Sequence, residues 1–171
     1  MKELLLKLKA CKEAIKWAGD KTAEEVIATC HRGDWLLWLA YKLEVDDRPF
    51  TLAKGHCANT VRHLMKDNKS IKAVDAAIAY GNGEISKEDL KAAAADAAGM
   101  GAAAASAAYY AAAAASAAYY YAAYAAFAAA ASAASFSSWL NTAAYDAEKS
   151  NQLETADICR KYLGKLILEK L

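Results

Sequence analysis

Residues 102–127 read AAAASAAYYAAAAASAAYYYAAYAAF and carry no charged side chain. Alanine is the strongest helix former, and the charge-free stretch extends on both sides, from Ala97 to Tyr145. We therefore expect a long helix that runs from about Ala102 towards Ser150. At about 1.5 Å per residue, a straight helix of this length would extend roughly 70 Å, which exceeds the diameter of a small domain.

The predicted helix has a short internal repeat and two places where it can be interrupted. The interruptions are the glycines of Gly99–Gly101 and the serines of Ser135–Ser138, and the motif SAAYY begins at Ser106 and again at Ser116. With residues placed 100° apart, the bulky side chains fall within about a third of the helix circumference, opposite a face that is nearly all alanine. The bulky residues are Tyr109, Tyr110, Tyr120, Tyr121, Tyr124 and Phe127.

Three roles fit an uncharged tract of alanine and tyrosine: an ice-binding face, a membrane span and a packed helix. An ice-binding face is disfavoured because the tract has no threonine before Thr142. A membrane span is disfavoured because no leucine or isoleucine lies between Met100 and Leu140, and tyrosine prefers the membrane interface. We favour packing within the fold or within a homo-oligomer, where an alanine face lets helix backbones approach closely.

The composition places the chain among ordinary globular proteins. Its 171 residues suffice for one domain with a core, and its formal net charge of +1 disfavours a nucleic-acid binder, which would show a basic patch. Lys7 and Lys9 interrupt the apolar run at the start, so we expect no secretory signal and a cytoplasmic protein. The cysteines are scattered singly, and we expect reduced thiols buried as small apolar groups.

Capping signals divide the first part of the chain into short helices. Apolar residues from Leu4 to Ala18 recur at helical spacing, and Gly19 is the expected stop. The sequence Thr22–Glu25 is a capping box, which predicts a helix running to about Cys30. Asp34 is the expected N-cap of the next helix, whose sequence is WLLWLAYKL.

Similar signals mark the helices that follow. Pro49 can occupy the first turn of a helix that runs to about Asp67. Asn68–Ser70 is the predicted turn and cap before the next helix, which ends at Gly81–Gly83. Ser86–Asp89 is a second capping-box pattern, which opens the alanine-rich region.

We predict an all-α fold, either a helical bundle or an array of short helices with a long alanine- and tyrosine-rich helix. No segment shows sustained period-two alternation, so no sheet is expected. The start signal Asn151–Glu154 predicts a separate C-terminal helix, with Gly164 as a fraying point. A single domain is expected over residues 1–171, made of a short-helix part (1–90), an alanine-, tyrosine- and serine-rich part (91–150) and the C-terminal helix (151–171).

The candidate ligands for a metal ion are Cys30–His31 and His56–Cys57, with His63 two helical turns beyond His56. Such residues can hold zinc, but the close CxxC or HxxxH spacing of common sites is missing. A Cys-His nucleophile lacks an orienting acid and an oxyanion loop in the sequence. We therefore predict no catalytic residue, no metal and no cofactor. An enzyme that uses this Cys/His set remains the least favoured alternative.

Two tryptophans are candidate anchors for a protein partner. Tryptophan is enriched at the energetic centres of interfaces, although Trp35 and Trp38 could equally belong to the core, which we favour. If a partner binds, we expect it first at Asp34, Trp35 and Trp38, and second at the tyrosine face through Tyr120 and Tyr124.

Several stretches together, in order and over most of the chain, resemble a family of bacterial immunity proteins, the immunity-protein-5-like group linked to polymorphic toxin systems. The most specific are CHRGDWLLWL and TADICRKYL, the latter within NQLETADICRKYL. The others are ACKEAIKWAGDKTAEEV, TLAKGHCANTVRHLMKD, SIKAVDAAIAYGNGEIS and the alanine-tyrosine tract.

The resemblance implies an all-helical protein that binds a cognate toxin, blocks it and needs no cofactor. We therefore expect a non-enzymatic protein that acts by protein-protein interaction. We expect it neither to bind nucleic acid nor to span a membrane. A scaffold protein that self-associates through the alanine- and tyrosine-rich helix remains the main alternative.

Overall fold

The all-α prediction is confirmed by the structure of the chain, a computed structural model that describes residues 1–65, 68–98 and 138–171. Every regular element within these ranges is a helix. Most of the alanine-tyrosine tract, with Tyr120 and Tyr124, lies outside the described residues.

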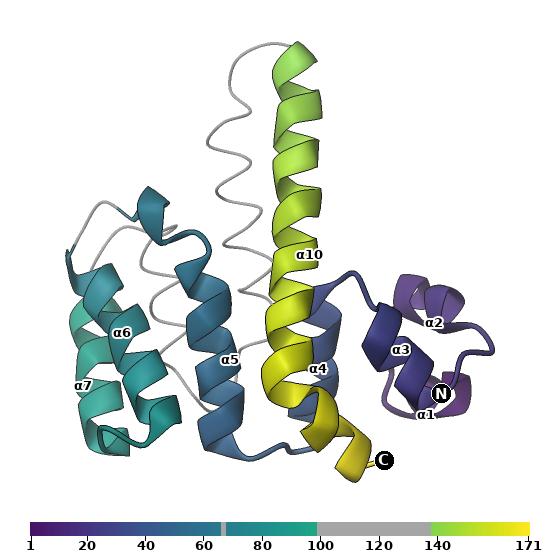
Figure 1. Ribbon diagram of the computed structural model, residues 1–171, viewed down its shortest axis with the longest axis horizontal. Coiled ribbons are helices and arrows are strands. Elements are labelled where there is room, and N and C mark those ends of the chain that lie inside the picture. Colours follow the sequence, from purple (N-terminus) through teal and green to yellow (C-terminus); the bar gives the residue numbers. More distant parts are fainter. Residues whose placement is uncertain (66–67, 99–137) are drawn as a thin grey trace.

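The described helices form an extended array (Figure 1). They are α1 (Lys2–Lys7), α2 (Lys12–Ala18), α3 (Ala23–Thr29), α4 (Gly33–Lys42), α5 (Asp47–Asn59), the short 3-10 helix η1 (Arg62–Leu64), α6 (Asn68–Asn82), α7 (Lys87–Ala98) and α10 (Ser138–Glu169).

The N-terminal segment forms two helices, where the sequence predicted one continuous stripe. Lys9 adopts a positive φ of 60°, which breaks the helix after α1. Cys11 then becomes the N-cap of α2, because its sulfur accepts the Ala14 N–H at 3.4 Å. The predicted stop at Gly19 is confirmed, since this residue caps α2 with a φ of 50°.

Both predicted capping boxes are present. The Thr22 hydroxyl accepts the Glu25 N–H at 3.2 Å, and the Glu25 carboxylate accepts the Thr22 N–H at 2.8 Å. Ser86 and Asp89 exchange the same pair of contacts before α7, each at 3.1 Å. These local signals therefore set the starts of α3 and α7.

Helix ends in the middle of the chain differ from the predictions. The α5 helix includes Pro49 in its first turn, as predicted, but ends at Asn59 instead of about Asp67. The predicted turn Asn68–Ser70 is already the first turn of α6, and Gly83, with a φ of 85°, follows the end of that helix as expected.

The last helix is longer than its capping signals suggested. The predicted start at Asn151–Glu154 lies inside α10, which begins at Ser138 and is continuous to Glu169. Thr155 Oγ1 donates to the Asn151 carbonyl at 2.9 Å, so this hydroxyl binds its own helix. Gly164 is buried within the helix and does not mark a frayed end.

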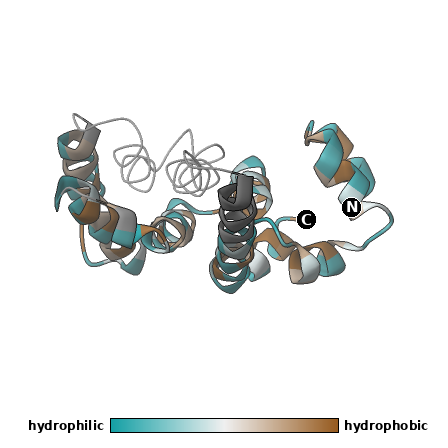
Figure 2. Ribbon diagram, turned by 90° about the horizontal axis from the view of Figure 1, so that it is seen from above, coloured by the Kyte–Doolittle hydropathy of each residue, from teal (hydrophilic) through white to brown (hydrophobic). Residues whose placement is uncertain are grey.

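Neighbouring helices pack side by side along the array. The α5 helix packs on α6, and α6 packs on α7, while α10 packs on α3, α4 and α5. Viewed from above, α10 stands between the α6–α7 side and the N-terminal helices (Figure 2). The N-terminal half of α10 extends beyond α3, α4 and α5, against which its C-terminal half packs (Figure 1).

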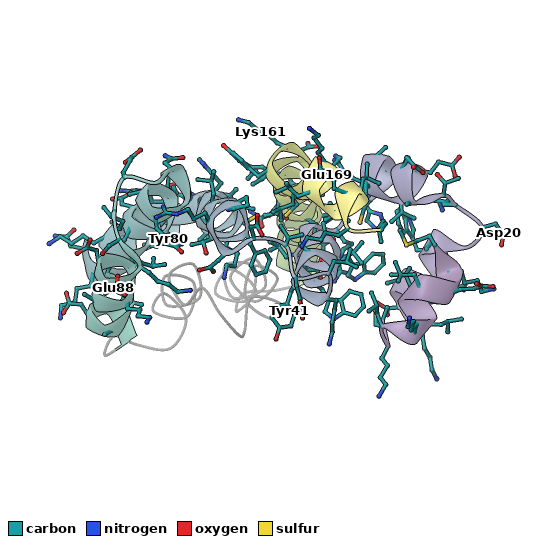
Figure 3. All side chains as sticks on the ribbon, turned by 90° about the horizontal axis from the view of Figure 1, so that it is seen from below. Asp20, Tyr41, Tyr80, Glu88, Lys161 and Glu169 are labelled. Carbon is teal, nitrogen blue, oxygen red and sulfur yellow. The ribbon has the colours of Figure 1, made fainter. Side chains whose placement is uncertain are left out.

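Two clusters of buried apolar residues hold the array together. The larger cluster joins α1 to α5 with the C-terminal half of α10, and its fully buried members include Leu36, Leu37, Leu163 and Ile167. The smaller cluster joins the end of α5 to α6 and α7 around Val74 and Leu90. The loop that carries Asp20 and the start of α7 near Glu88 lie at opposite ends of the molecule (Figure 3).

Candidate functional site

Four aromatic side chains from separate elements meet at the N-terminal end of the array. We call Trp17, His31, Trp35 and Trp38 the tryptophan face. Trp17 lies on α2, His31 follows α3, and the other two lie one turn apart on α4. All three tryptophans are half-buried against the larger core, whereas His31 is exposed. The predicted core role of Trp35 and Trp38 is therefore correct for only part of each ring.

Three of these rings contact one another pairwise. Ring centroids lie 5.6 Å apart for Trp17 and His31, and 5.8 Å apart for Trp35 with each of the other two. The rings are inclined by 56° to 69°, in the range of edge-to-face contacts. Mutual packing therefore fixes the orientation of the exposed ring edges.

Two cations rest on these rings. Lys21 Nζ lies 4.6 Å from the Trp17 ring centroid and donates to the Trp17 carbonyl at 2.6 Å. The Arg32 guanidinium lies 5.0 Å from the Trp35 ring and donates to both carboxylate oxygens of Asp34, at 2.8 and 2.6 Å. The face therefore combines apolar rings with charge held in place by cation–π contacts.

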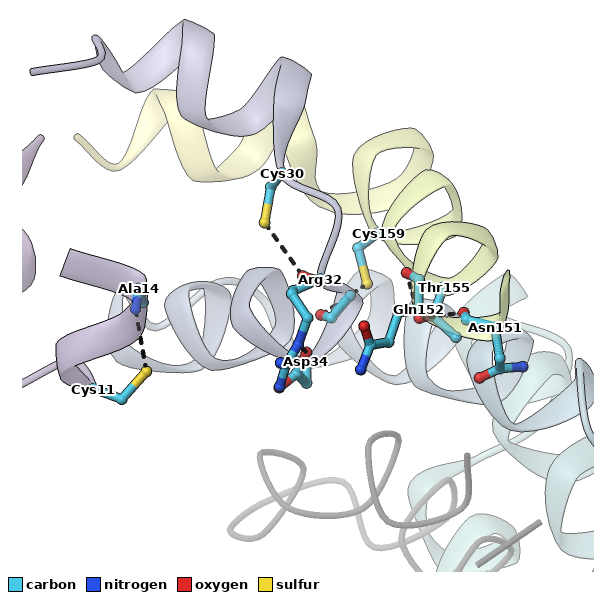
Figure 4. Close-up of polar contacts among 10 residues, drawn as sticks. Cys11, Ala14, Cys30, Arg32, Asp34, Asn151, Gln152, Thr155 and Cys159 are labelled. Carbon is cyan, nitrogen blue, oxygen red and sulfur yellow. Dashed lines mark hydrogen bonds and ion pairs between the residues drawn. The ribbon is translucent and has the colours of Figure 1, made fainter. Parts of the chain in front are cut away.

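The predicted capping role of Asp34 is wrong. The α4 helix begins one residue earlier, at Gly33, with Arg32 as its N-cap. The Asp34 carboxylate forms a bidentate ion pair with Arg32, and the residue is 8% exposed (Figure 4). Asp34 therefore holds in place the guanidinium that lies over Trp35, and it contributes to the tryptophan face through Arg32.

A small apolar pocket lies beside these rings. Residues of α1, α2, α3 and α4 line it, among them Leu5, Cys11, Trp17, Trp35 and Trp38. Its volume is about 30 Å³, room for roughly two or three water molecules. A site for a metabolite or drug-sized ligand spans roughly 300–1,000 Å³. The pocket is therefore a notch that can receive the tip of one apolar side chain.

The residues weighed as a candidate Cys/His set have separate contacts. His56 stacks on Tyr162 with ring centroids 4.8 Å apart, and the Tyr162 hydroxyl lies 3.0 Å from His56 Nε2. Burial lowers the pKa of His56, with a smaller effect from the nearby Lys161 cation. His63 is exposed on η1. Within the part of the chain that the structure describes, no three Cys, His, Asp or Glu side chains are grouped to hold a metal ion.

Three of the four cysteines are buried thiols, as predicted, but Cys11 is exposed. Cys30 lines the pocket, and its thiol donates to the Arg32 carbonyl at 3.4 Å. Burial raises the pKa of Cys30 to about 11, so this thiol is a poor nucleophile at neutral pH.

Sequence reasoning found half of the tryptophan face. It singled out Trp35 and Trp38, and the structure brings them to one surface with two residues that it missed, Trp17 and His31. The enrichment of tryptophan at interfaces pointed to the first pair, whereas the second pair joins it only through the packing of α2 and α3. Tyr120 and Tyr124, the remaining predicted residues, lie outside the described residues.

The chain matches no protein-family model, no curated protein sequence and no solved structure. In the ranges that the structure describes, no helix is both long and apolar enough to cross a membrane.

Proposed function

We propose that this protein binds a partner protein through the tryptophan face and that, like the immunity proteins it resembles, it neutralises a toxin by this contact. The observation that carries the proposal is the set of half-exposed rings Trp17, Trp35 and Trp38 around an apolar notch. Tryptophan and arginine are the residues that most often supply binding energy at protein interfaces.

The construction of the face favours a large partner. The notch of about 30 Å³ is too small for a metabolite, but a protein surface can insert one side chain there and cover the surrounding rings. The rings are already packed against one another, so binding would cost little conformational entropy. A preorganised face of this kind suits an inhibitor that must hold its target tightly.

Affinity capture from the native cell tests the proposal. The tagged chain is purified, and co-purifying proteins are identified by mass spectrometry. We expect a stoichiometric toxin, encoded beside this chain, whose expression kills cells unless the chain is also expressed. Trp35→Ala should weaken the complex by roughly 30-fold or more, the effect of losing about 2 kcal/mol at an energetic centre.

The matched control is Leu153→Ala on α10, which removes another exposed apolar side chain that does not line the pocket. This variant should bind the toxin with unchanged affinity, and circular dichroism should show that both variants fold. Recovery of nothing but copies of the chain itself would contradict the proposal and favour self-association. Equal loss of affinity in both variants would place the contact elsewhere.

A further inference from the structure

Two thiols from distant parts of the sequence lie next to each other in the core. Cys57 Sγ on α5 and Cys159 Sγ on α10 are 3.8 Å apart, and the two residues are 3% and 0% exposed. We infer that this pair is a redox-sensitive site, at which a peroxide converts the two thiols to a disulfide that links α5 to α10.

The surroundings of the pair favour bond formation between these two sulfurs. A disulfide has an S–S length of about 2.05 Å, so oxidation must bring the two sulfurs closer than their present 3.8 Å. Cys57 Sγ also lies 3.8 Å from the Thr155 carbonyl, and the Cys159 thiol donates to the Gly33 carbonyl at 3.5 Å. These weak contacts at their long distances hold neither thiol firmly in its present rotamer.

The chemistry needs only a small oxidant. One thiolate attacks hydrogen peroxide, its sulfur gains an oxygen to become a sulfenic acid, and hydroxide leaves and takes up a proton to form water. The second thiol then attacks the sulfenic sulfur, so that an S–S bond forms and the S–O bond breaks, releasing a second water molecule. Two thiols lose two electrons and two protons in total, and one peroxide is reduced.

Burial sets the rate of the first step. The neighbouring Cys57 thiol and burial together raise the pKa of Cys159 well above its usual range, so its thiolate is scarce at neutral pH. We therefore expect slow oxidation, followed by rapid closure because the second sulfur is already adjacent. The exposed Cys11 should react first and independently.

The cross-link would act on the whole array. It joins residues 102 positions apart, so the closed loop contains α6, α7 and α10 as far as Cys159. Closing so long a loop removes much conformational freedom from the unfolded chain. It also removes the hydrogen bond to the Gly33 carbonyl, at the start of the helix that carries Trp35 and Trp38.

The test uses the full-length chain with Cys11→Ala, which removes the exposed thiol as a route to intermolecular links. After treatment with hydrogen peroxide, peptide mapping without reductant should find a Cys57–Cys159 link that dithiothreitol reverses. The oxidised protein should melt roughly 5–15 °C higher than the reduced protein, the range expected for a disulfide across a long loop.

Two further variants keep the result decisive. Adding Cys30→Ala should leave the link unchanged, whereas adding Cys159→Ala should abolish both the link and the rise in Tm. The inference is overturned if both core thiols stay reduced after prolonged treatment with peroxide well above the dose that fully oxidises Cys11 in the unsubstituted chain. It is also overturned if they become separate sulfinic acids, or if the link joins Cys30 to Cys159.

Discussion

Gly33 on α4 lies directly against Thr155 of α10, and adding one methyl group there should loosen the scaffold of the tryptophan face. A Cβ atom at this position would lie 2.5 Å from Thr155 Oγ1, 2.6 Å from the Thr155 carbonyl carbon and 2.7 Å from Thr155 Cβ. The hydroxyl could rotate away, but the carbonyl carbon belongs to the α10 backbone. The two helices would therefore have to separate in Gly33→Ala.

The size of the effect follows from two opposing contributions. Overpacking in a core costs about 1–3 kcal/mol, and a clash with backbone belongs at the upper end of that range. Replacing glycine by alanine in a helix returns up to about 1 kcal/mol, less in the first turn. We expect Gly33→Ala to lower the free energy of unfolding by about 2 kcal/mol, with a fall in Tm of about 4–8 °C.

Gly164→Ala is the matched control. It adds the same methyl group to a buried glycine of α10, but the nearest atom is the Ile27 Cγ2 methyl at 3.2 Å, a side-chain atom at a longer distance than the backbone carbon that Gly33→Ala would meet. The helix-propensity gain should offset the crowding and leave stability within about 1 kcal/mol of the wild type. Urea unfolding followed by circular dichroism measures both variants. A Gly33→Ala protein as stable as the wild type, or a larger loss in Gly164→Ala, would refute the packing argument.

Three other substitutions test separate features, each by urea unfolding. Burial lowers the pKa of Lys54 to about 8, so Lys54→Met should raise the free energy of unfolding by about 1–3 kcal/mol at pH 7. Its advantage should shrink as the pH rises from about 8 to 10, because the wild type then loses its buried charge; a constant advantage would contradict this. Asp47→Asn should lower the free energy of unfolding by about 1 kcal/mol at pH 7. The reason is that the Asp47 carboxylate accepts hydrogen bonds from Lys87 at 2.6 Å and Tyr80 at 2.9 Å. Burial alone would raise the pKa of Asp47, but the hydrogen bonds from Lys87 and Tyr80 outweigh it and lower this pKa. The loss of stability in Asp47→Asn should therefore fade as the pH drops below the usual Asp range. A loss that persists at that pH would contradict the role given to these hydrogen bonds. Thr22→Ala should cost about 1 kcal/mol through the loss of its capping hydroxyl, and a neutral result would show that the capping box adds nothing.

Local signals in the sequence predicted helix starts well wherever the caps bind only their own helix. The boxes at Thr22–Glu25 and Ser86–Asp89 are of this kind, since each needs only backbone N–H groups three residues away. Asp34 failed as a predicted cap because Arg32, two residues earlier, takes both of its carboxylate oxygens. A side chain with two suitable partners cannot be assigned from spacing alone.

Helix length was harder to predict because tertiary packing decides it. Asn151–Glu154 has the composition of a helix start, yet α10 continues through it. Asn151 Nδ2 donates instead to Thr60 Oγ1 at 2.8 Å, a contact with a residue distant in the sequence. In the opposite sense, the apolar stripe from Leu4 to Ala18 did not reveal the positive φ of Lys9.

The residues of the candidate site also fall into two groups: those that the sequence alone could identify, and those that only tertiary packing brings together. Trp35 and Trp38 could be found because tryptophan is enriched at interface centres and both lie in one predicted helix. Trp17 joins them only because tertiary packing brings its ring onto Trp35, and no sequence signal for that approach was recognised. The adjacency of Cys57 and Cys159 likewise depends on the packing of α10 against α5.

Hydrogen exchange of the complex with its captured partner tests the central claim, that the tryptophan face is the binding surface. Backbone amides of the free and bound protein are compared by mass spectrometry. The account predicts slower exchange on binding in residues 14–21 and 31–41, which carry the four rings and their cations, and unchanged exchange in α6 and α7. Slower exchange confined to α6 and α7, with residues 14–21 and 31–41 unaffected, would contradict it.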